Sequence, residues 1–322
     1  MCTGGRRALL TGWRVPQPYP GELGYSVVAR YVERWGRLDP VGLLTQVFGY
    51  RPSSAHPACP PALGKLASTI YDTTPDAVSL FISKHTLVPY YLAFGGPALA
   101  ARTLSTLRND ERACAIKVLG TSALRHSAPA VLRACRACLQ ADRDAGIEQH
   151  WRRVHQLPGV FHCFTHRDRL YDSSIPFELD RRLDFRTVNV AEIQSSLRPA
   201  GPPVFGRDLE RRITAQSARL LDGNGSYFLD GSMADYRRRL MQFGFGGRRN
   251  ELRISAFEKD FMTWLSRHGC NPLRLGTGRW WLRMLTAIPG RSLVLQHLTL
   301  QEFLRDKMSS YLRTNPDLFG YE

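Results

Sequence analysis

Two short pairs of metal-binding residue types stand close together in the middle of this 322-residue chain. Cys135 and Cys138 are separated by two residues, and Cys163 and His166 repeat that spacing after 24 intervening residues. A turn with this spacing can direct both side chains at one point, and thiolate and imidazole are ligands that zinc accepts in tetrahedral sites. The pattern therefore predicts one structural Zn²⁺ held by Cys135, Cys138, Cys163 and His166.

The same residues allow other interpretations. The first two cysteines also fit the apolar stripe of a helix, in which both thiols would be buried as small hydrophobic groups. A pair with this spacing also occurs in redox proteins, although no alternation of strands and helices surrounds it here. His150, His155 and His162 lie nearby, and His155 is the best substitute ligand. Four protein ligands leave no open coordination position, which argues against a catalytic zinc.

The chain is strongly basic and otherwise has the composition of a soluble globular protein. Lysine and arginine number 44 against 28 aspartate and glutamate residues, which gives a formal net charge of +16. Such an excess predicts a polyanionic partner, most often nucleic acid, although a generally basic soluble protein would look the same. The seven cysteines, an odd number, favour a reducing cytoplasm over a disulfide scaffold.

Several function classes are disfavoured by what the sequence lacks. No apolar run reaches the roughly 18 residues that a membrane span requires, and the run Ala8–Leu10 is too short for a signal sequence. We therefore expect a cytoplasmic protein without a membrane partner. The chain carries no phosphate-loop, hydrolase-nucleophile or zinc-protease motif, and its carboxylates do not cluster as a two-metal nuclease would require. These features favour an adaptor over an enzyme.

The residues before the metal pattern predict a helical domain. Apolar side chains follow Leu23 at helical spacing, and Asp39-Pro40 and Thr74-Pro75-Asp76 are typical helix starts. Another helix is predicted over residues 97–108, after two glycines. His85 lies within this predicted core, so we expect a buried packing histidine rather than a catalyst.

The C-terminal part is also predicted to be helical. The segment 199–203 is typical of a linker, and a helix is predicted over 208–221. Ser232-x-x-Asp235 and Ser255-x-x-Glu258 have the pattern of capping boxes that open two further helices. Two helices with a glycine-containing turn favour a helix-turn-helix-like unit, although a solvated basic face explains the same arginines. The tentative DNA contacts are Arg152, Arg153, Arg237, Arg238, Arg239, Arg248 and Arg249.

Together these patterns predict a mainly α protein with four parts. Residues 1–18 are a flexible lead-in, and residues 19–130 form an N-terminal helical domain of helix-turn-helix-like character. Residues 131–200 form a small zinc-binding module with a short β-hairpin, whose strands are predicted at Val160–His162 and Leu170–Tyr171. Residues 201–322 form a C-terminal helical, helix-turn-helix-like domain.

The metal segment resembles the zinc-binding signature of the TniQ/TnsD family. The resemblance rests on C-x2-C, on W-R-R-V-H-Q-L-P-G-V at 151–160 and on C-x2-H, with further similarity at 18–23, 85–94 and 280–304. The family usually has proline after the first cysteine and glycine after the histidine, where this chain has Arg136 and Arg167. Both departures predict less preorganised turns and a weaker hold on the metal, with no ligand missing.

The resemblance implies a non-enzymatic adaptor that selects target sites in DNA transposition. Its implied partners are double-stranded DNA, a transposon AAA+ ATPase of the TnsC type and, in some members, a CRISPR Cascade complex with guide RNA. A homodimer and association with the bacterial nucleoid are further expectations. The tail and the charge favour direct DNA binding. The alternatives are an RNA-guided member without sequence specificity of its own, a zinc or C-x2-C-dependent enzyme, and an RNA-binding zinc protein.

Overall fold

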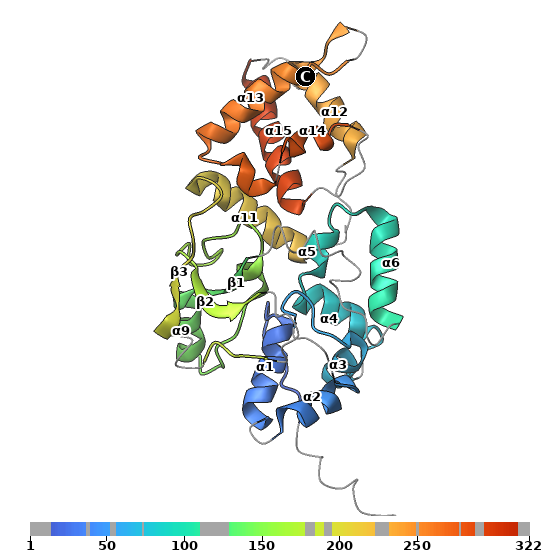
Figure 1. The fold of residues 1–322 in the computed structure, drawn as a ribbon, viewed down its shortest axis with the longest axis vertical. Coiled ribbons are helices and arrows are strands. Elements are labelled where there is room, and N and C mark those ends of the chain that lie inside the picture. Colours follow the sequence, from blue (N-terminus) through green and yellow to red (C-terminus); the bar gives the residue numbers. More distant parts are fainter. Residues whose placement is uncertain are drawn as a thin grey trace, which may run out of the picture.

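Helices dominate the computed structural model, which describes residues 14–36, 39–51, 56–72, 74–109, 129–177, 184–189, 195–222, 232–248, 251–276, 278–286 and 293–314. One small antiparallel sheet accompanies the helices, so the prediction of a mainly α protein is confirmed. The molecule is elongated, with the N-terminal helices towards one end and the C-terminal helices at the other, and the sheet lies beside the N-terminal helices at the level of α4 to α6 (Figure 1).

The N-terminal part consists of short helices around a shared apolar core. They are α1 (Gly24–Trp35), α2 (Pro40–Phe48), α3 (Leu63–Ile70), α4 (Ala77–His85), α5 (Val88–Leu92) and α6 (Gly96–Asn109). The predicted start of α2 is confirmed, because the Asp39 side chain accepts from the amide of Gly42 at 2.8 Å. In α4 the cap is Asp76 rather than Thr74, because Asp76 accepts from the amide of Ser79.

The sheet joins segments that are far apart in the sequence. Its strands are β1 (Val131–Ala134), β2 (Tyr171–Pro176) and β3 (Arg198–Pro199), in the order β1-β2-β3. Ala134 is paired with Tyr171, so the residue before Cys135 lies opposite the start of β2. The predicted hairpin is reduced to one bridge between His162 and Arg169, because β2 pairs with β1 instead. The sheet thereby fixes the start of the metal segment.

The C-terminal part surrounds an aromatic core. Its elements are α11 (Arg207–Asp222), α12 (Met233–Leu240), the π-turn η2 (Met241–Phe245), α13 (Ile254–Arg267), the 3-10 turn η4 (Pro272–Leu275), α14 (Trp280–Arg283) and α15 (Val294–Thr314). Ser232 caps α12 as predicted, accepting from the amide of Asp235. The cap predicted at Ser255 is wrong: the Arg253 amide is bonded to the Phe245 carbonyl, and α13 already begins at Ile254. The helix-turn-helix-like character of α12 and α13 stays a prediction.

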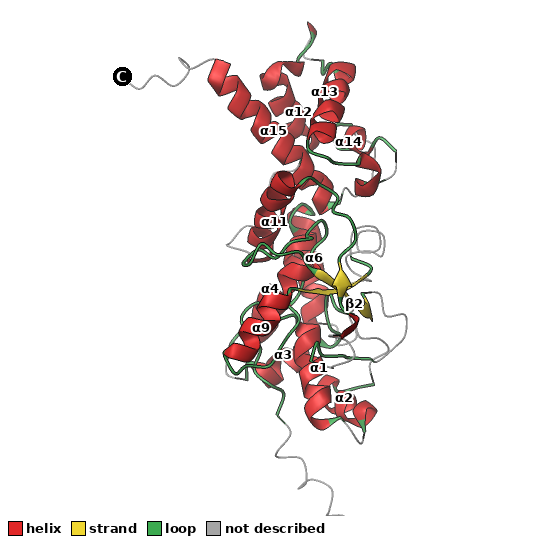
Figure 2. Ribbon diagram, turned by 90° about the vertical axis from the view of Figure 1, so that its left-hand side faces the viewer, coloured by secondary structure: helices red, strands yellow, loops and turns green. Residues whose placement is uncertain are grey.

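Helix α11 links the two helical ends of the molecule. It packs against α5 on one side and α15 on the other. Its Arg212 forms ion pairs with Glu302, at 2.6 Å, and with Asp306, at 3.1 Å. Figure 2 shows α11 between the group α12–α15 and the remaining helices. None of the helices within the described ranges has the length and apolar character to cross a membrane.

Candidate metal centre

Two local structures present the four predicted ligands. Cys135 lies at the end of β1 and is the N-cap residue of α9 (Arg136–Asp144), so Cys138 follows in the first turn of that helix. Cys163 and His166 lie in a tight turn, closed by the Cys163 amide donating to the Asp168 carbonyl at 2.8 Å. A strand-to-helix junction on one side and a closed turn on the other thus hold the two pairs.

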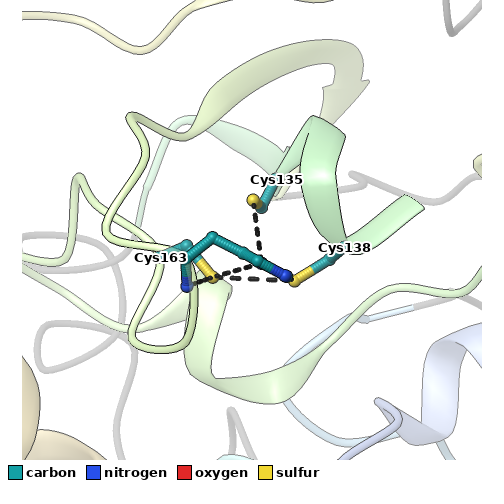
Figure 3. A group of neighbouring side chains, drawn as sticks. Cys135, Cys138 and Cys163 are labelled. Carbon is teal, nitrogen blue, oxygen red and sulfur yellow. Dashed lines mark hydrogen bonds between the residues drawn. The ribbon is translucent and has the colours of Figure 1, made fainter. Parts of the chain in front are cut away.

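The four ligand atoms converge on one point, as the three cysteines in Figure 3 show. They all lie within 4.8 Å of one another. His166 Nδ1 is 3.2 Å from Cys138 Sγ, and Cys138 Sγ is 3.6 Å from Cys163 Sγ. A tetrahedral zinc with Zn–S bonds of about 2.3 Å requires ligand separations of about 3.7 Å, so the donor set fits such an ion. The three cysteines are buried and form no disulfide with one another, whereas His166 is exposed.

The thiols compete for charge in the absence of a cation. Hydrogen bonds with Cys135 and Cys163 raise the pKa of Cys138 far above its ordinary value. Hydrogen bonds from Cys135 and Cys138 lower the pKa of Cys163, so the three neighbouring thiols do not all lose their protons together. A metal ion between the sulfurs would remove the conflict, because each ligand could then lose its proton. The arrangement can therefore hold a metal ion.

The other histidines near the metal segment lie outside the ligand cluster. His150 lies 3.4 Å from Asp142, and His162 lies 2.8 Å from Glu210. His155 is buried beside the cluster, and its Nε2 has no hydrogen-bond partner among the described residues. The clustered ligand atoms include His166 and not His155. His166 therefore supplies the fourth ligand atom of this cluster, and His155 lies outside it.

The two departures from the family pattern fall at positions with special backbone requirements. Arg136 is the first residue of α9, where proline is favoured because its fixed φ suits a helix start. Its guanidinium instead lies 4.0 Å from the Tyr171 ring and donates to the Leu197 carbonyl. Arg167 has φ +62°, the left-handed conformation that glycine adopts most easily. The proline and the glycine of the family thus match the backbone seen here.

Two of the predicted DNA-contact arginines are engaged inside the protein. Arg152 binds Asp142 with two hydrogen bonds, at 3.0 and 2.6 Å. Arg153 is buried and donates to the carbonyls of Ser83, at 2.7 Å, and Thr86, at 3.2 Å. Burial lowers the pKa of Arg153 to about 10. The Arg152 pair thus lies within the metal segment, whereas Arg153 joins that segment to the end of α4 and is too buried to contact DNA.

Four of the other predicted DNA contacts fall within the described residues, at the C-terminal end of the molecule. Arg237 donates to the Leu285 carbonyl at 3.1 Å, and Arg238 and Arg239 both pair with Asp235. Arg248 is exposed after η2, and Arg249 lies outside the described residues. The structure therefore does not bring the predicted arginines into one cluster.

The sequence did not predict that two family-like segments contact each other. The Leu23 amide donates to the Trp151 carbonyl at 2.8 Å, and the Arg153 amide donates to the Gly21 carbonyl at 2.9 Å. The segments 18–23 and 151–160 thus lie side by side. No signal in either segment alone indicates this pairing, because backbone hydrogen bonds between distant segments depend on the fold.

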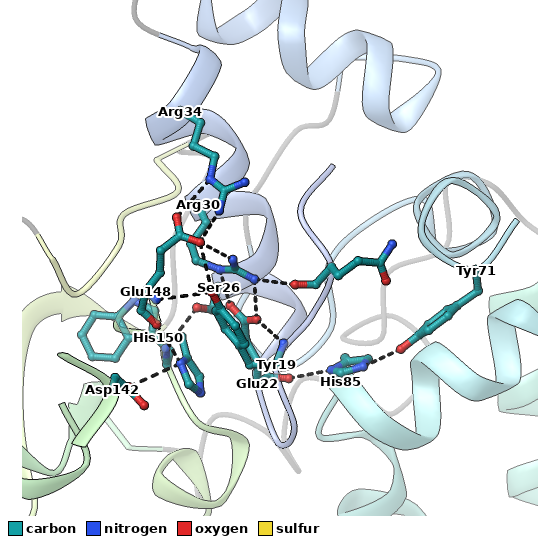
Figure 4. A network of polar contacts seen from close by, with 12 residues as sticks. Tyr19, Glu22, Ser26, Arg30, Arg34, Tyr71, His85, Asp142, Glu148 and His150 are labelled. Carbon is teal, nitrogen blue, oxygen red and sulfur yellow. Dashed lines mark hydrogen bonds and ion pairs between the residues drawn. The ribbon is translucent and has the colours of Figure 1, made fainter. Parts of the chain in front are cut away.

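A buried polar network surrounds this contact (Figure 4). Arg30 of α1 binds both oxygens of Glu22 and also Glu148, which precedes the 151–160 segment. His85 is buried, with Nδ1 2.9 Å from the Glu22 carbonyl and Nε2 2.7 Å from the Tyr71 hydroxyl. The expectation of a packing histidine at position 85 is confirmed. The network attaches α1 and α4 to the metal segment.

Comparison with known proteins identifies this region. Residues 13–170 match the TniQ family model. The chain is also 30% identical over 151 residues to the transposon Tn7 transposition protein TnsD of Escherichia coli, a match that covers 47% of this chain and 30% of that protein. The chain thus spans about a third of the length of the curated relative that it matches. The matched residues include the helices α1 to α6, the network around Glu22 and all four clustered ligands. Through residues 13–170, the chain belongs to the TniQ/TnsD family.

Proposed function

We propose that this protein is a non-enzymatic adaptor that selects target sites in DNA transposition. The observation that carries the proposal is the family match over residues 13–170. This range includes both the N-terminal helices and the complete ligand cluster. The match to a transposition protein supports the same process. The division at residues 1–18, 19–130, 131–200 and 201–322 is part of this proposal.

The proposed metal is one structural Zn²⁺. Three cysteine sulfurs and one imidazole nitrogen form a donor set that zinc prefers, and four protein ligands leave no position for a reacting water. The free energy of metal binding, on the order of 10 kcal/mol in zinc peptides, is also folding free energy. The ion would hold α9 against the turn that carries Cys163 and His166, and its role would be structural.

The proposed partners are double-stranded DNA and a transposon AAA+ ATPase of the TnsC type, which the adaptor would recruit to the selected site. The formal charge of +16 supports an interaction with DNA phosphates. Among the predicted contacts, Arg238, Arg239 and Arg248 are exposed, and the first two are paired with Asp235. Docking on a Cascade complex with guide RNA is the alternative mode of targeting, and a homodimer is compatible with either mode.

A comparison of binding to two DNA duplexes tests the proposal. Fluorescence anisotropy would measure binding of the zinc-loaded protein to the native attachment DNA and to a shuffled duplex of equal length, at several salt concentrations. Direct target selection predicts a clear preference for the native sequence and an affinity that falls steeply with salt. Equal binding to both duplexes contradicts direct selection. ATPase capture by immobilised adaptor, with and without the DNA, tests recruitment separately.

A redox or zinc enzyme is the remaining candidate of another class. A redox pair requires Cys135 and Cys138 to be free to exchange a disulfide, but both sulfurs lie in the same cluster as Cys163 and His166. Thiol titration of native protein before and after zinc removal separates the two ideas. Because four further cysteines lie outside the cluster, the readout is the difference between the two titrations. Three fewer reactive thiols with one equivalent of zinc support the structural role, and an unchanged thiol count contradicts it.

A further inference from the structure

The turn that carries two of the metal ligands meets the N-terminal end of α11 at a surface pocket. The pocket has a volume of about 560 Å³, and Phe164 and Arg167 from the turn and Arg207 and Arg211 from α11 contribute to its lining. We call these four residues the knuckle surface. All four are exposed, and the Phe164 side chain, at 56% exposure, is one of the most exposed large apolar side chains in the described residues.

The arginines of the knuckle surface are not used by the fold. Within the described part of the chain, Arg167, Arg207 and Arg211 have no ion pair and no side-chain hydrogen bond. Their neighbour Arg212, by contrast, pairs with Glu302 and Asp306. Three guanidinium groups are thus available to a ligand at one pocket.

Their positions are also locally unfavourable. Arg167 adopts the left-handed φ of +62°, which costs a residue other than glycine free energy. Arg207 is the first residue of α11, and Arg211 follows one turn later. Positive charges near a helix N-terminus face the positive end of the helix dipole. The presence of arginine at these three positions is therefore not explained by a contribution to the stability of the helix or the turn.

The floor of the pocket does not cancel their charge. Glu210 lines the pocket but is buried, and its Oε1 accepts from the Phe161 amide at 2.9 Å and lies 2.8 Å from His162. Asp168 is the exposed carboxylate in the lining. The exposed charged residues that line the pocket are therefore three arginines and one aspartate. This excess of positive charge favours an anionic partner.

We propose that the knuckle surface is a DNA contact. The arginines would bind phosphates of one strand, and Phe164 would lie against a sugar or a base at the same point. Arginine supplies the bidentate phosphate contact, and an aromatic face adds stacking or apolar contact that an inorganic anion would not need. The proposal rests on the DNA-binding part of the proposed function and assigns it to a surface different from the arginines of α12.

Charge-matched variants test the assignment. One variant carries Arg167→Gln, Arg207→Gln and Arg211→Gln. The control carries Arg51→Gln, Arg102→Gln and Arg267→Gln, which removes the same charge from exposed arginines elsewhere. Binding to a 30-base-pair duplex is measured by anisotropy over a salt series, after zinc content and circular dichroism confirm that each variant is folded. The knuckle variant should lose about tenfold or more in affinity, and its salt slope should fall by about 2 to 3, whereas the control should stay near wild type.

Phe164 supplies an independent readout. Phe164→Ser should weaken binding several-fold without changing the salt slope, and Phe164→Trp should retain affinity, because only the aromatic contact is altered. If the wild type binds DNA and the knuckle variant binds equally well, this assignment is overturned while DNA binding stands. Equal losses in both charge variants also overturn it, because they indicate non-specific attraction. If the wild type binds no duplex but binds an acidic peptide through the same residues, the DNA-binding proposal itself is overturned.

Discussion

Arg30 and Glu22 form a buried, bidentate ion pair, with Nε 2.9 Å from Oε1 and Nη2 2.8 Å from Oε2. The Arg30 side chain is 1% exposed and that of Glu22 is fully buried. Arg30 also lies 2.6 Å from Glu148, which Arg34 contacts as well. One guanidinium therefore ties α1 to the residues that lead from α9 to the 151–160 segment, and the metal segment depends on a charge from the N-terminal helices.

Glu22→Ala should strongly destabilise the protein. The substitution leaves the Arg30 charge buried with only Glu148 as a counter-ion, and breaking a buried pair costs about 3–5 kcal/mol. Asp184→Ala is the control, because it removes a carboxylate whose pair with Arg186 is largely exposed and should cost less than about 1 kcal/mol. Urea unfolding of both variants measures the two costs. Similar values for the two would show that the buried pair adds little.

Glu148 should make the stability of the folded protein depend on pH in the acidic range. Burial raises its pKa, but hydrogen bonds from Arg34 and Arg30 outweigh burial and hold the pKa below the ordinary glutamate value. A lowered folded-state pKa means that the stabilisation is present above the unfolded-state pKa and is lost as the pH falls through the folded-state value. In the wild type, the urea concentration at the unfolding midpoint should therefore decrease as the pH is lowered below about 4.5. Glu148→Gln should show a smaller drop over the same range, and an identical pH profile would contradict the assignment.

Arg167→Gly should strengthen the metal-binding turn. Glycine adopts the left-handed conformation at little cost, whereas Arg167→Ala retains the strain. We expect the glycine variant to be more stable than the alanine variant by about 1 kcal/mol, with slower zinc loss to a chromogenic chelator. The comparison of glycine with alanine controls for the lost guanidinium. Equal zinc-release rates would show that the turn is not strained.

Removal of one ligand should empty the centre and loosen the module. Cys138→Ser should lower the zinc content from one ion per chain to nearly none and expose residues 131–170 to proteolysis, because metal binding supplies folding free energy. Cys270→Ser is the control: this thiol is buried outside the cluster, where burial raises its pKa to about 12. Metal analysis and limited proteolysis distinguish the variants. A Cys138→Ser protein that keeps its zinc would point to another ligand, with His155 the nearest candidate.

Features that depend on short-range spacing can be predicted from the amino-acid sequence alone. The ligand pairs at 135–138 and 163–166, the caps at Asp39 and Ser232 and the packing role of His85 all follow from residue type and neighbouring positions. The failed cap at Ser255 shows the limit of such rules. There a backbone hydrogen bond to η2 accompanies a helix start two residues earlier than the local pattern predicts, with Arg253 instead of Ser255 at the N-cap.

Which charged side chains are exposed, and which distant segments contact each other, depends on the fold. Arg152 and Arg153 look like surface cations in the sequence, yet folding brings Asp142, Ser83 and Thr86 to them. Arg167 and Arg207, by contrast, meet at one pocket although 39 residues separate them. Local spacing cannot encode such encounters, because whether an arginine is neutralised or exposed depends on carboxylates and carbonyls delivered by distant parts of the chain.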